Sequence, residues 1–149
     1  MTNKIIPDVI SNQSLKTLPP EASVREAANV MGSSRISAIL ILEDDGLIGI
    51  VTERDMTAKV LAVGLDPEAT QVSEVMTPNP DCLSPDDAPN SALEKMRDRG
   101  YRHLPVVDGE EVVGILSIRD LYAYVKNQLE EDVRQREAFI FDTGYGAGS

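Results

Sequence analysis

The 149-residue chain has no tryptophan, two phenylalanines, four tyrosines, one cysteine and one histidine. With so few aromatic side chains, aliphatic residues must build the core. The single Cys82 has no partner for a disulfide within the chain, and one cysteine with one histidine cannot complete a closed zinc site. The sequence therefore predicts a protein of ordinary domain size without a structural metal.

Long apolar runs and an excess of positive charge are also missing. The longest apolar runs, such as Ala38 to Leu42, are far shorter than the ~20 residues that span a bilayer, and residues 1–7 lack a secretory apolar stretch. The formal net charge is −11, whereas nucleic acid is bound by clustered Lys and Arg. We expect a cytoplasmic protein with no membrane or nucleic-acid partner, in which an anionic ligand would need a local basic pocket.

The chain contains an internal repeat. Six residues recur without a gap at a constant separation of 65 positions: Pro20, Ala27, Met31, Gly49, Arg54 and Asp55 recur as Pro85, Ala92, Met96, Gly114, Arg119 and Asp120. Because apolar and polar positions keep one register, the pattern indicates two copies of one unit. We expect an N-terminal segment over 1–13, a first repeat over 14–66, a linker over 67–79, a second repeat over 80–138 and a tail over 139–149.

Each copy predicts the order strand, helix, strand, strand, helix, which makes an α+β fold. Apolar residues at helical spacing predict the first helices, with Val24, Ala27, Ala28 and Met31 in one copy and Pro89, Ala92, Leu93 and Met96 in the other. Strand pairs joined by tight turns are expected over 36–42 with 47–51 and over 104–107 with 112–116. The closing helices are expected to start at Thr52 and Ser117, and the second to run to about Ala138.

The residues that carry chemistry stand where the last strand of each copy meets the closing helix. They read Gly-Ile-Val-Thr-Glu-Arg-Asp over 49–55 and Gly-Ile-Leu-Ser-Ile-Arg-Asp over 114–120. A hydroxyl residue followed three positions later by Asp predicts a capping box at the start of each helix. The same geometry lets the Asp carboxylate accept hydrogen bonds from both hydroxyls of a ribose, while the hydroxyl and the helix N-terminus face a phosphate.

Both heptapeptides resemble the motif of the cystathionine β-synthase (CBS) domain family: a glycine, a hydrophobic pair, Thr or Ser, two variable residues and Asp. The resemblance covers about residues 14–125 and is supported by Val-Ser-Glu-Val-Met-Thr over 72–77 and Tyr-Arg-His-Leu-Pro-Val-Val over 101–107. It implies a tandem module, packed as a pseudo-twofold pair, that binds an adenosine-containing nucleotide between strands and regulates another protein. Such a module is not an enzyme, and the chain shows no nucleophile with a matching base.

The resemblance and the motif together select the candidate nucleotide-binding residues. They are Ile36, Ser37, Ala38, Thr52, Arg54 and Asp55 in the first copy, and Tyr101, Arg102, His103, Leu104, Pro105, Ser117, Arg119 and Asp120 in the second. Arg35 is a further basic neighbour. Several of these residues could also have a role that needs no ligand. Ile36 and Leu104 could pack in the core, and each arginine could form a surface ion pair. The motif residues could serve only to cap the helices. Because Arg-Gly-Tyr-Arg-His over 99–103 offers more donors than Ser-Arg-Ile-Ser-Ala over 34–38, we expect the second site to bind more tightly.

The ligand is not fixed by these residues. A ribose-binding Asp suits AMP, ADP, ATP, NAD and S-adenosylmethionine alike, whereas the 2′-phosphate of NADP is disfavoured beside Asp55 or Asp120. The alternative function is a structural dimerisation module with unoccupied nucleotide pockets. The regulated protein is not encoded in the motif.

Assembly is also implied by the resemblance. We expect a homodimer in which Leu121, Tyr122 and Val125 contribute to a self-complementary interface. The tail over 139–149 holds both phenylalanines, Tyr145 and three glycines. We expect it to dock on the second subunit, with disorder as the alternative.

Overall fold

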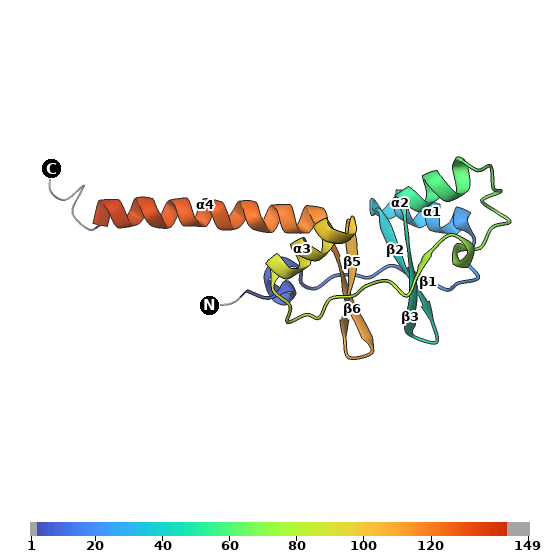
Figure 1. The fold of residues 1–149 in the computed structure, drawn as a ribbon, viewed down its shortest axis with the longest axis horizontal. Coiled ribbons are helices and arrows are strands. Elements are labelled where there is room, and N and C mark those ends of the chain that lie inside the picture. The colour runs from blue at the N-terminus through green and yellow to red at the C-terminus, as the bar shows by residue number, and fades with distance from the viewer. Residues whose placement is uncertain (1–2, 143–149) are drawn as a thin grey trace.

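A computed structural model of the protein describes residues 3–142. Two α+β repeats lie side by side, and one long helix projects from the second (Figure 1). In chain order the elements are η1 (Ile5–Val9), β1 (Thr17–Leu18), α1 (Val24–Ser34), β2 (Ala38–Glu43), β3 (Gly46–Thr52), α2 (Glu53–Asp55), η2 (Met56–Leu61), η3 (Val72–Glu74), β4 (Thr77–Pro78), α3 (Pro89–Arg99), β5 (His103–Asp108), β6 (Glu111–Ser117) and α4 (Ile118–Asp142). The expected α+β fold of two repeats is confirmed.

The first repeat is built on a four-stranded sheet in the order β1-β2-β3-β4. β1 is parallel to β2, and the other pairs are antiparallel. Ser23 caps α1 by accepting a hydrogen bond from the Glu26 N–H at 3.0 Å. The helix buries Val24, Ala27 and Met31, but Ala28 is exposed, contrary to the expected stripe.

The second repeat reproduces the first at the same separation of 65 positions. β5 and β6 form an antiparallel hairpin with a register shift between Val106 and Val107, matching the shift between Ile41 and Leu42. A parallel bridge from Leu83 to Val106 replaces the β1–β2 pairing. The duplication seen in the sequence therefore extends to strand register.

Two element boundaries differ by more than one residue from the sequence expectation. The strand expected from Ile36 begins at Ala38, because α1 ends at Arg35 in the left-handed conformation and residues 36–37 connect the two elements. The final helix continues to Asp142, past the expected end at Ala138, since no glycine or proline interrupts it. The first four residues of the expected tail thus belong to α4, and residues 143–149 lie outside the described residues.

The two segments that precede the repeats cross over in space. Ile5 and Ile10 are buried in the core of the second repeat with Leu83, Met96 and Leu116 among others. Residues 72–78 instead lie against the first repeat, where Val72 joins the core and β4 pairs with β3. Each repeat is therefore completed by the segment that lies before the other one in the sequence.

The repeats meet through their sheets. Ala38, Leu40 and Ile50 form a buried cluster with the partly buried Val112 and Ile115. Ile50 and Ile115 are equivalent positions of the two copies, which agrees with a pseudo-twofold arrangement. Among the described residues, no helix combines the length and the hydrophobicity that spanning a membrane would require.

Candidate functional site

A cleft of about 1040 Å³ lies between the two repeats. Its walls come from the loops before β2 and β5, the starts of α2 and α4, and the segment before β1. Thirteen of the fourteen candidate residues line it: Ile36, Ser37, Ala38, Thr52, Arg54, Asp55, Tyr101, Arg102, His103, Leu104, Ser117, Arg119 and Asp120. Pro105 is the exception, because it lies within the buried part of β5, pairs with Ile115 and accepts a hydrogen bond from the Leu83 N–H.

Both strand-to-helix junctions form the expected capping boxes. The Thr52 N–H donates to Asp55 Oδ2 at 2.9 Å, and the Asp55 N–H donates to Thr52 Oγ1 at 3.3 Å. In the second repeat the Ser117 N–H donates to Asp120 Oδ2 at 2.9 Å, and the Asp120 N–H donates to Ser117 Oγ at 3.1 Å. Capping therefore explains one carboxylate oxygen of each aspartate and leaves Oδ1 of each for another partner.

The second carboxylate oxygen differs between the repeats. Asp55 Oδ1 forms an ion pair with Lys59 Nζ at 3.0 Å, and this ammonium also donates to the Val75 carbonyl at 3.0 Å. Position 59 corresponds to Tyr124, which lacks a charge. Within the described residues, Asp120 Oδ1 makes no hydrogen bond and no ion pair. Of the two motif aspartates, Asp120 is therefore the one that keeps a carboxylate oxygen without a partner in the described part of the chain, and this residue lines the cleft.

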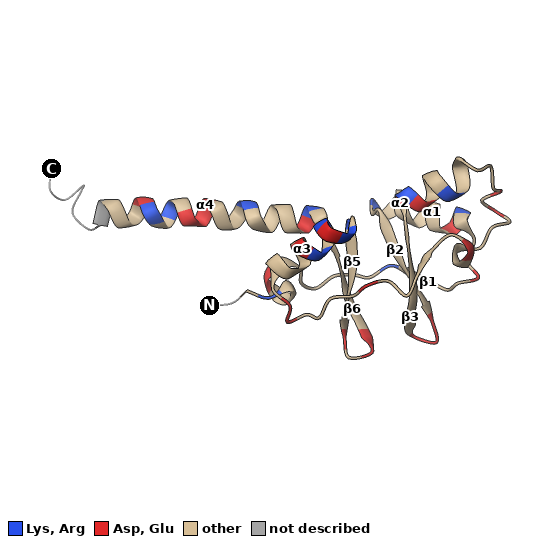
Figure 2. Ribbon diagram, viewed as in Figure 1, with Lys and Arg blue, Asp and Glu red and all other residues tan. Residues whose placement is uncertain are grey.

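Basic side chains surround the cleft on an acidic protein. Five of its lining residues are Lys or Arg (Lys16, Arg35, Arg54, Arg102 and Arg119), against four Asp or Glu (Glu53, Asp55, Asp81 and Asp120). Several lie at the ends of β2 and β5 and the starts of α2 and α4 (Figure 2). The surface ion pairs weighed for the arginines are not formed: in the described part of the chain, none of the four arginines has an acidic partner within salt-bridge distance. Their guanidinium donors are available to an anion.

His103 joins the two repeats across the cleft. Its Nε2 lies 2.7 Å from Ser37 Oγ. Burial lowers the pKa of His103 below 6.5, opposed by Asp120 and Glu53 and assisted by Arg102 and Arg119. At neutral pH the imidazole is therefore uncharged and acts in the cleft through hydrogen bonding.

Apolar side chains line the cleft beside these polar groups. Leu104 belongs to the core of the second repeat, and Ile36 packs against that of the first, yet both also line the cleft. The two interpretations considered for these residues, packing and access to the cleft, are thus compatible.

Sequence reasoning missed the segment before each first strand. Gln13, Ser14, Leu15 and Lys16 line the cleft, as do Pro80 and Asp81. Leu15 and Lys16 occupy the positions equivalent to Pro80 and Asp81. The constant separation of 65 positions shows that these two segments are equivalent, and it could have predicted that both line the cleft.

Cys82 is half-buried, and its Sγ donates to the Pro80 carbonyl at 3.3 Å. Burial, together with the charge of Asp81, raises the pKa of the thiol, with Lys95 acting in the opposite direction. The thiol is therefore protonated and poorly nucleophilic at neutral pH.

Comparison with known proteins agrees with this architecture. The CBS domain family model matches residues 6–62 and 72–127. The Arabidopsis thaliana protein CBSCBSPB3 is 37% identical over 123 residues, covering 82% of this chain and 22% of the relative, so the chain spans about a fifth of that relative's length.

Two solved structures share the fold. A Burkholderia ambifaria protein described as a signal-transduction protein with CBS domains superposes with a TM-score of 0.78 at 30% identity, covering 83% of this chain and 93% of that one. The Pyrobaculum aerophilum CBS domain protein PAE2072, solved in complex with AMP, gives a TM-score of 0.68 at 29% identity, covering 74% and 85%. This chain therefore belongs to the CBS-domain family and is a tandem pair of CBS repeats, a module of the signal-transduction type.

Proposed function

We propose that the protein is a non-catalytic regulatory module that binds an adenosine nucleotide in the cleft between its repeats. The observation that carries the proposal is the convergence of two hydroxyl–aspartate junctions and four arginines without acidic partners on one cleft. In a protein of net charge −11, such a concentration of free guanidinium groups favours an anionic ligand.

The second repeat supplies the stronger half of the proposed site. Asp120 Oδ1 would accept hydrogen bonds from the ribose hydroxyls while Oδ2 stays in the capping box. Arg102 and Arg119 would neutralise phosphate, and the Tyr101 ring and the aliphatic wall would contact the base. The AMP complex of PAE2072 shows that a CBS relative binds such a ligand.

The ligand is drawn from AMP, ADP, ATP and NAD, with S-adenosylmethionine as a further member of the class. We propose no metal requirement. We also propose a cytoplasmic homodimer that passes the nucleotide signal to a separate regulated protein.

Isothermal titration calorimetry with these five compounds tests the proposal. Asp120→Ala removes two charge-assisted hydrogen bonds to ribose and should weaken binding by roughly 2–4 kcal/mol, which is on the order of 30-fold or more in the dissociation constant. Asp55→Ala should be milder, because Lys59 already occupies the Asp55 carboxylate.

Circular dichroism controls for folding, since Asp120→Ala also removes a cap worth about 1 kcal/mol. Binding unaltered in Asp120→Ala but abolished in Asp55→Ala would reverse the ranking of the two sites. The Lys59 ion pair occupies the Asp55 carboxylate, which is compatible with one alternative, a structural dimerisation module with unoccupied pockets. Failure of all five compounds to bind would contradict our proposal and favour that alternative.

A further inference from the structure

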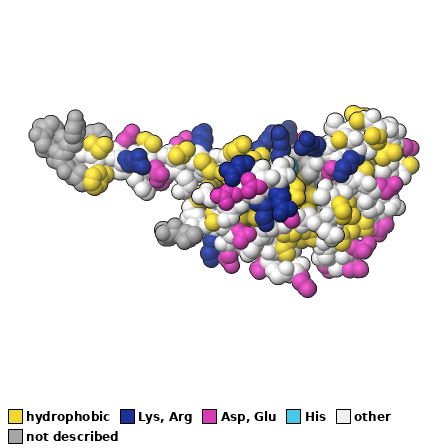
Figure 3. Space-filling view, viewed as in Figure 1, with side chains coloured by type: hydrophobic (Ala, Val, Ile, Leu, Met, Phe, Trp, Pro, Cys, Tyr) yellow, Lys and Arg dark blue, Asp and Glu magenta, His cyan; other side chains and the backbone are white. Residues whose placement is uncertain are grey.

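The distal part of α4 carries an apolar stripe outside the cleft. Every side chain described from Lys126 to Ile140 is exposed, and this part of the helix extends away from both repeats (Figure 1). Large apolar side chains recur along it, with exposed fractions of 63% for Tyr122, 60% for Leu129 and 54% for Val133. Figure 3 shows hydrophobic side chains spaced along this projecting helix. Leu121, expected in an interface, is instead buried in the second-repeat core.

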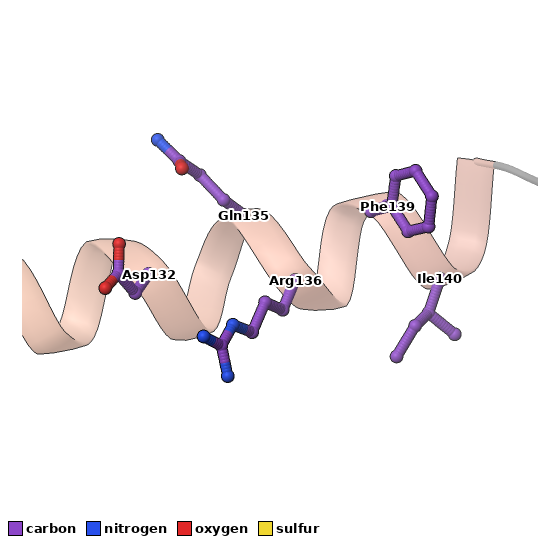
Figure 4. A pocket seen from close by; sticks show the side chains of 5 residues that line it. All are labelled: Asp132, Gln135, Arg136, Phe139 and Ile140. Carbon is purple, nitrogen blue, oxygen red and sulfur yellow. The ribbon is translucent and has the colours of Figure 1, made fainter. Parts of the chain in front are cut away.

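The stripe is straight. With 3.6 residues per turn, Tyr122, Val125, Val133, Arg136 and Ile140 all lie within about 40° of the line along the helix through Leu129. Figure 4 shows the Arg136 and Ile140 side chains on the same side of the helix, with Gln135 on the other. Residues 122 and 133, and residues 129 and 140, are eleven positions apart, a spacing that keeps a stripe on one face without left-handed supercoiling.

The order of the stripe is symmetric about Leu129. Val125 and Val133 stand four positions on either side, and Tyr122 and Arg136 stand seven positions away. A twofold axis at Leu129 would therefore place Val125 against Val133 of a second copy running antiparallel, and Tyr122 against its Arg136, a pair that allows a cation–π contact.

Charge selects the antiparallel direction. Arg136 lies within about 20° of Leu129 around the helix. In a parallel pair it would face Arg136 of the second copy, and the two positive charges would repel each other. One flank of the stripe carries Lys126 in its first half and Glu130 and Glu137 in its second. An antiparallel copy about this axis brings each Lys126 to within about 3 Å, along the helix axis, of Glu130 of the other copy. It also leaves the two Glu130 residues equally close to each other, so two attractive contacts accompany one repulsive contact. The existing Lys126–Glu130 pair, at 3.9 Å and well exposed, competes little with such contacts.

We propose that α4 pairs antiparallel with α4 of a second copy of this chain, about a twofold axis at Leu129. The partner is a second copy of this chain, because a single twofold rotation places the apolar side chains against apolar side chains and Lys126 against Glu130. The pairing is independent of nucleotide binding in the cleft.

Disulfide trapping tests the geometry in full-length chains that carry Cys82→Ala. Val125→Cys and Val133→Cys chains are prepared separately, then oxidised alone and as a mixture. Antiparallel pairing predicts a cross-linked dimer in the mixture and at least tenfold less in either chain alone. Two copies of residue 125 would be about 12 Å apart along the axis, beyond the roughly 7 Å that a disulfide spans between Cα atoms.

The Ala138→Cys chain is the matched control, since residue 138 lies on the face opposite Leu129, and we expect no cross-link from it alone or mixed with either chain. Equal cross-linking of the Val125→Cys and Val133→Cys chains with themselves would overturn the antiparallel direction. No cross-link in the mixture would overturn pairing through this face.

Sedimentation velocity provides an independent measurement without cysteines. Leu129→Asp buries an uncompensated charge at the axis and should raise the dissociation constant of the pair on the order of 100-fold, whereas Ala138→Asp should leave it unchanged. The double variant Lys126→Glu/Glu130→Lys should pair with itself and weakly with the unaltered chain. Equal effects of Leu129→Asp and Ala138→Asp, or indiscriminate pairing of the double variant, would contradict the proposal.

Discussion

At the scale of single residues, Arg35 stands out by its backbone. It ends α1 with φ of 55° and ψ of 43°, in the left-handed region, whereas Gly100 takes the equivalent position of the second repeat. A side chain in this conformation costs roughly 1–2 kcal/mol, which glycine avoids. The first repeat thus keeps a strained arginine at the edge of the cleft, as residues retained for binding often are.

Arg35→Gly should therefore have opposite effects on folding and on binding. The free energy of unfolding should rise by about 1 kcal/mol, which raises Tm by about 2–4 °C, while removal of the cation weakens binding of AMP or ATP. Thermal melts and calorimetry measure the two effects. The reciprocal control is Gly100→Ala, where a Cβ meets no atom within 4 Å, so backbone strain alone should lower Tm. A lower Tm for Arg35→Gly would contradict this account.

At the scale of elements, the motif glycine of each last strand allows another segment to pass close by. A Cβ at Gly49 would lie 2.3 Å from Met76 Sδ and 3.1 Å from the Thr77 carbonyl oxygen. At Gly114 it would lie 3.0 Å from Ile10 Cδ1 and 3.1 Å from Gln13 Oε1. Glycine at the motif position thus leaves room for the segment that crosses each strand.

Alanine at these two positions should destabilise to different degrees. Overpacking costs about 1–3 kcal/mol, and we expect Gly49→Ala near the upper value because Thr77 is held by its pairing with Ile50 in the sheet. Gly114→Ala meets only side-chain atoms that can shift and should lie near the lower value. Urea unfolding of both variants provides the comparison, and a neutral Gly49→Ala would show that the covering segment is loosely held.

The helices and strands were largely predictable, because each sequence pattern that indicates them occurs twice, at positions 65 residues apart. Helices α1 and α3, both hairpins and both capping boxes follow from apolar spacing and from a hydroxyl three positions before an Asp. The crossing of residues 5–10 and 72–78 did not follow, since a short apolar segment carries no information about which repeat it joins. The ion pair of Lys59 with Asp55 joins residues four positions apart in the expected closing helix, so its spacing was present in the sequence although the sequence analysis did not use it.

At the scale of the whole molecule, polar contacts join the repeats across the cleft. The Ser37–His103 hydrogen bond is one of them, beside the apolar cluster formed by Leu40, Ile50 and Ile115. Because this hydrogen bond joins the two repeats, the protonation of His103 affects the stability of their packing against each other.

Lowering the pH should weaken the fold through His103. Its folded pKa lies below 6.5, so the unfolded chain takes up the proton more readily and the free energy of unfolding falls as pH drops below about 6.5. Above that value both states are neutral and the contribution is complete. Tm measured from pH 8 to pH 5 should fall more steeply for the unaltered protein than for His103→Gln, and parallel curves would contradict the assignment.

The crossing of the two segments also sets an order of events during synthesis. A chain made from its N-terminus can build the core of the first repeat once residue 78 has emerged, since the residues of that core and strand β4 precede this point. Its sheet contact with Val112 and Ile115 forms later. Ile5 and Ile10, although made first, must wait for Leu116 and Leu121 before they can be buried. During that interval the apolar side chains of residues 5–10 are exposed, and this segment can insert into the second repeat of a neighbouring nascent chain. Exchange of this segment between copies is the misassembly to which the topology is most exposed.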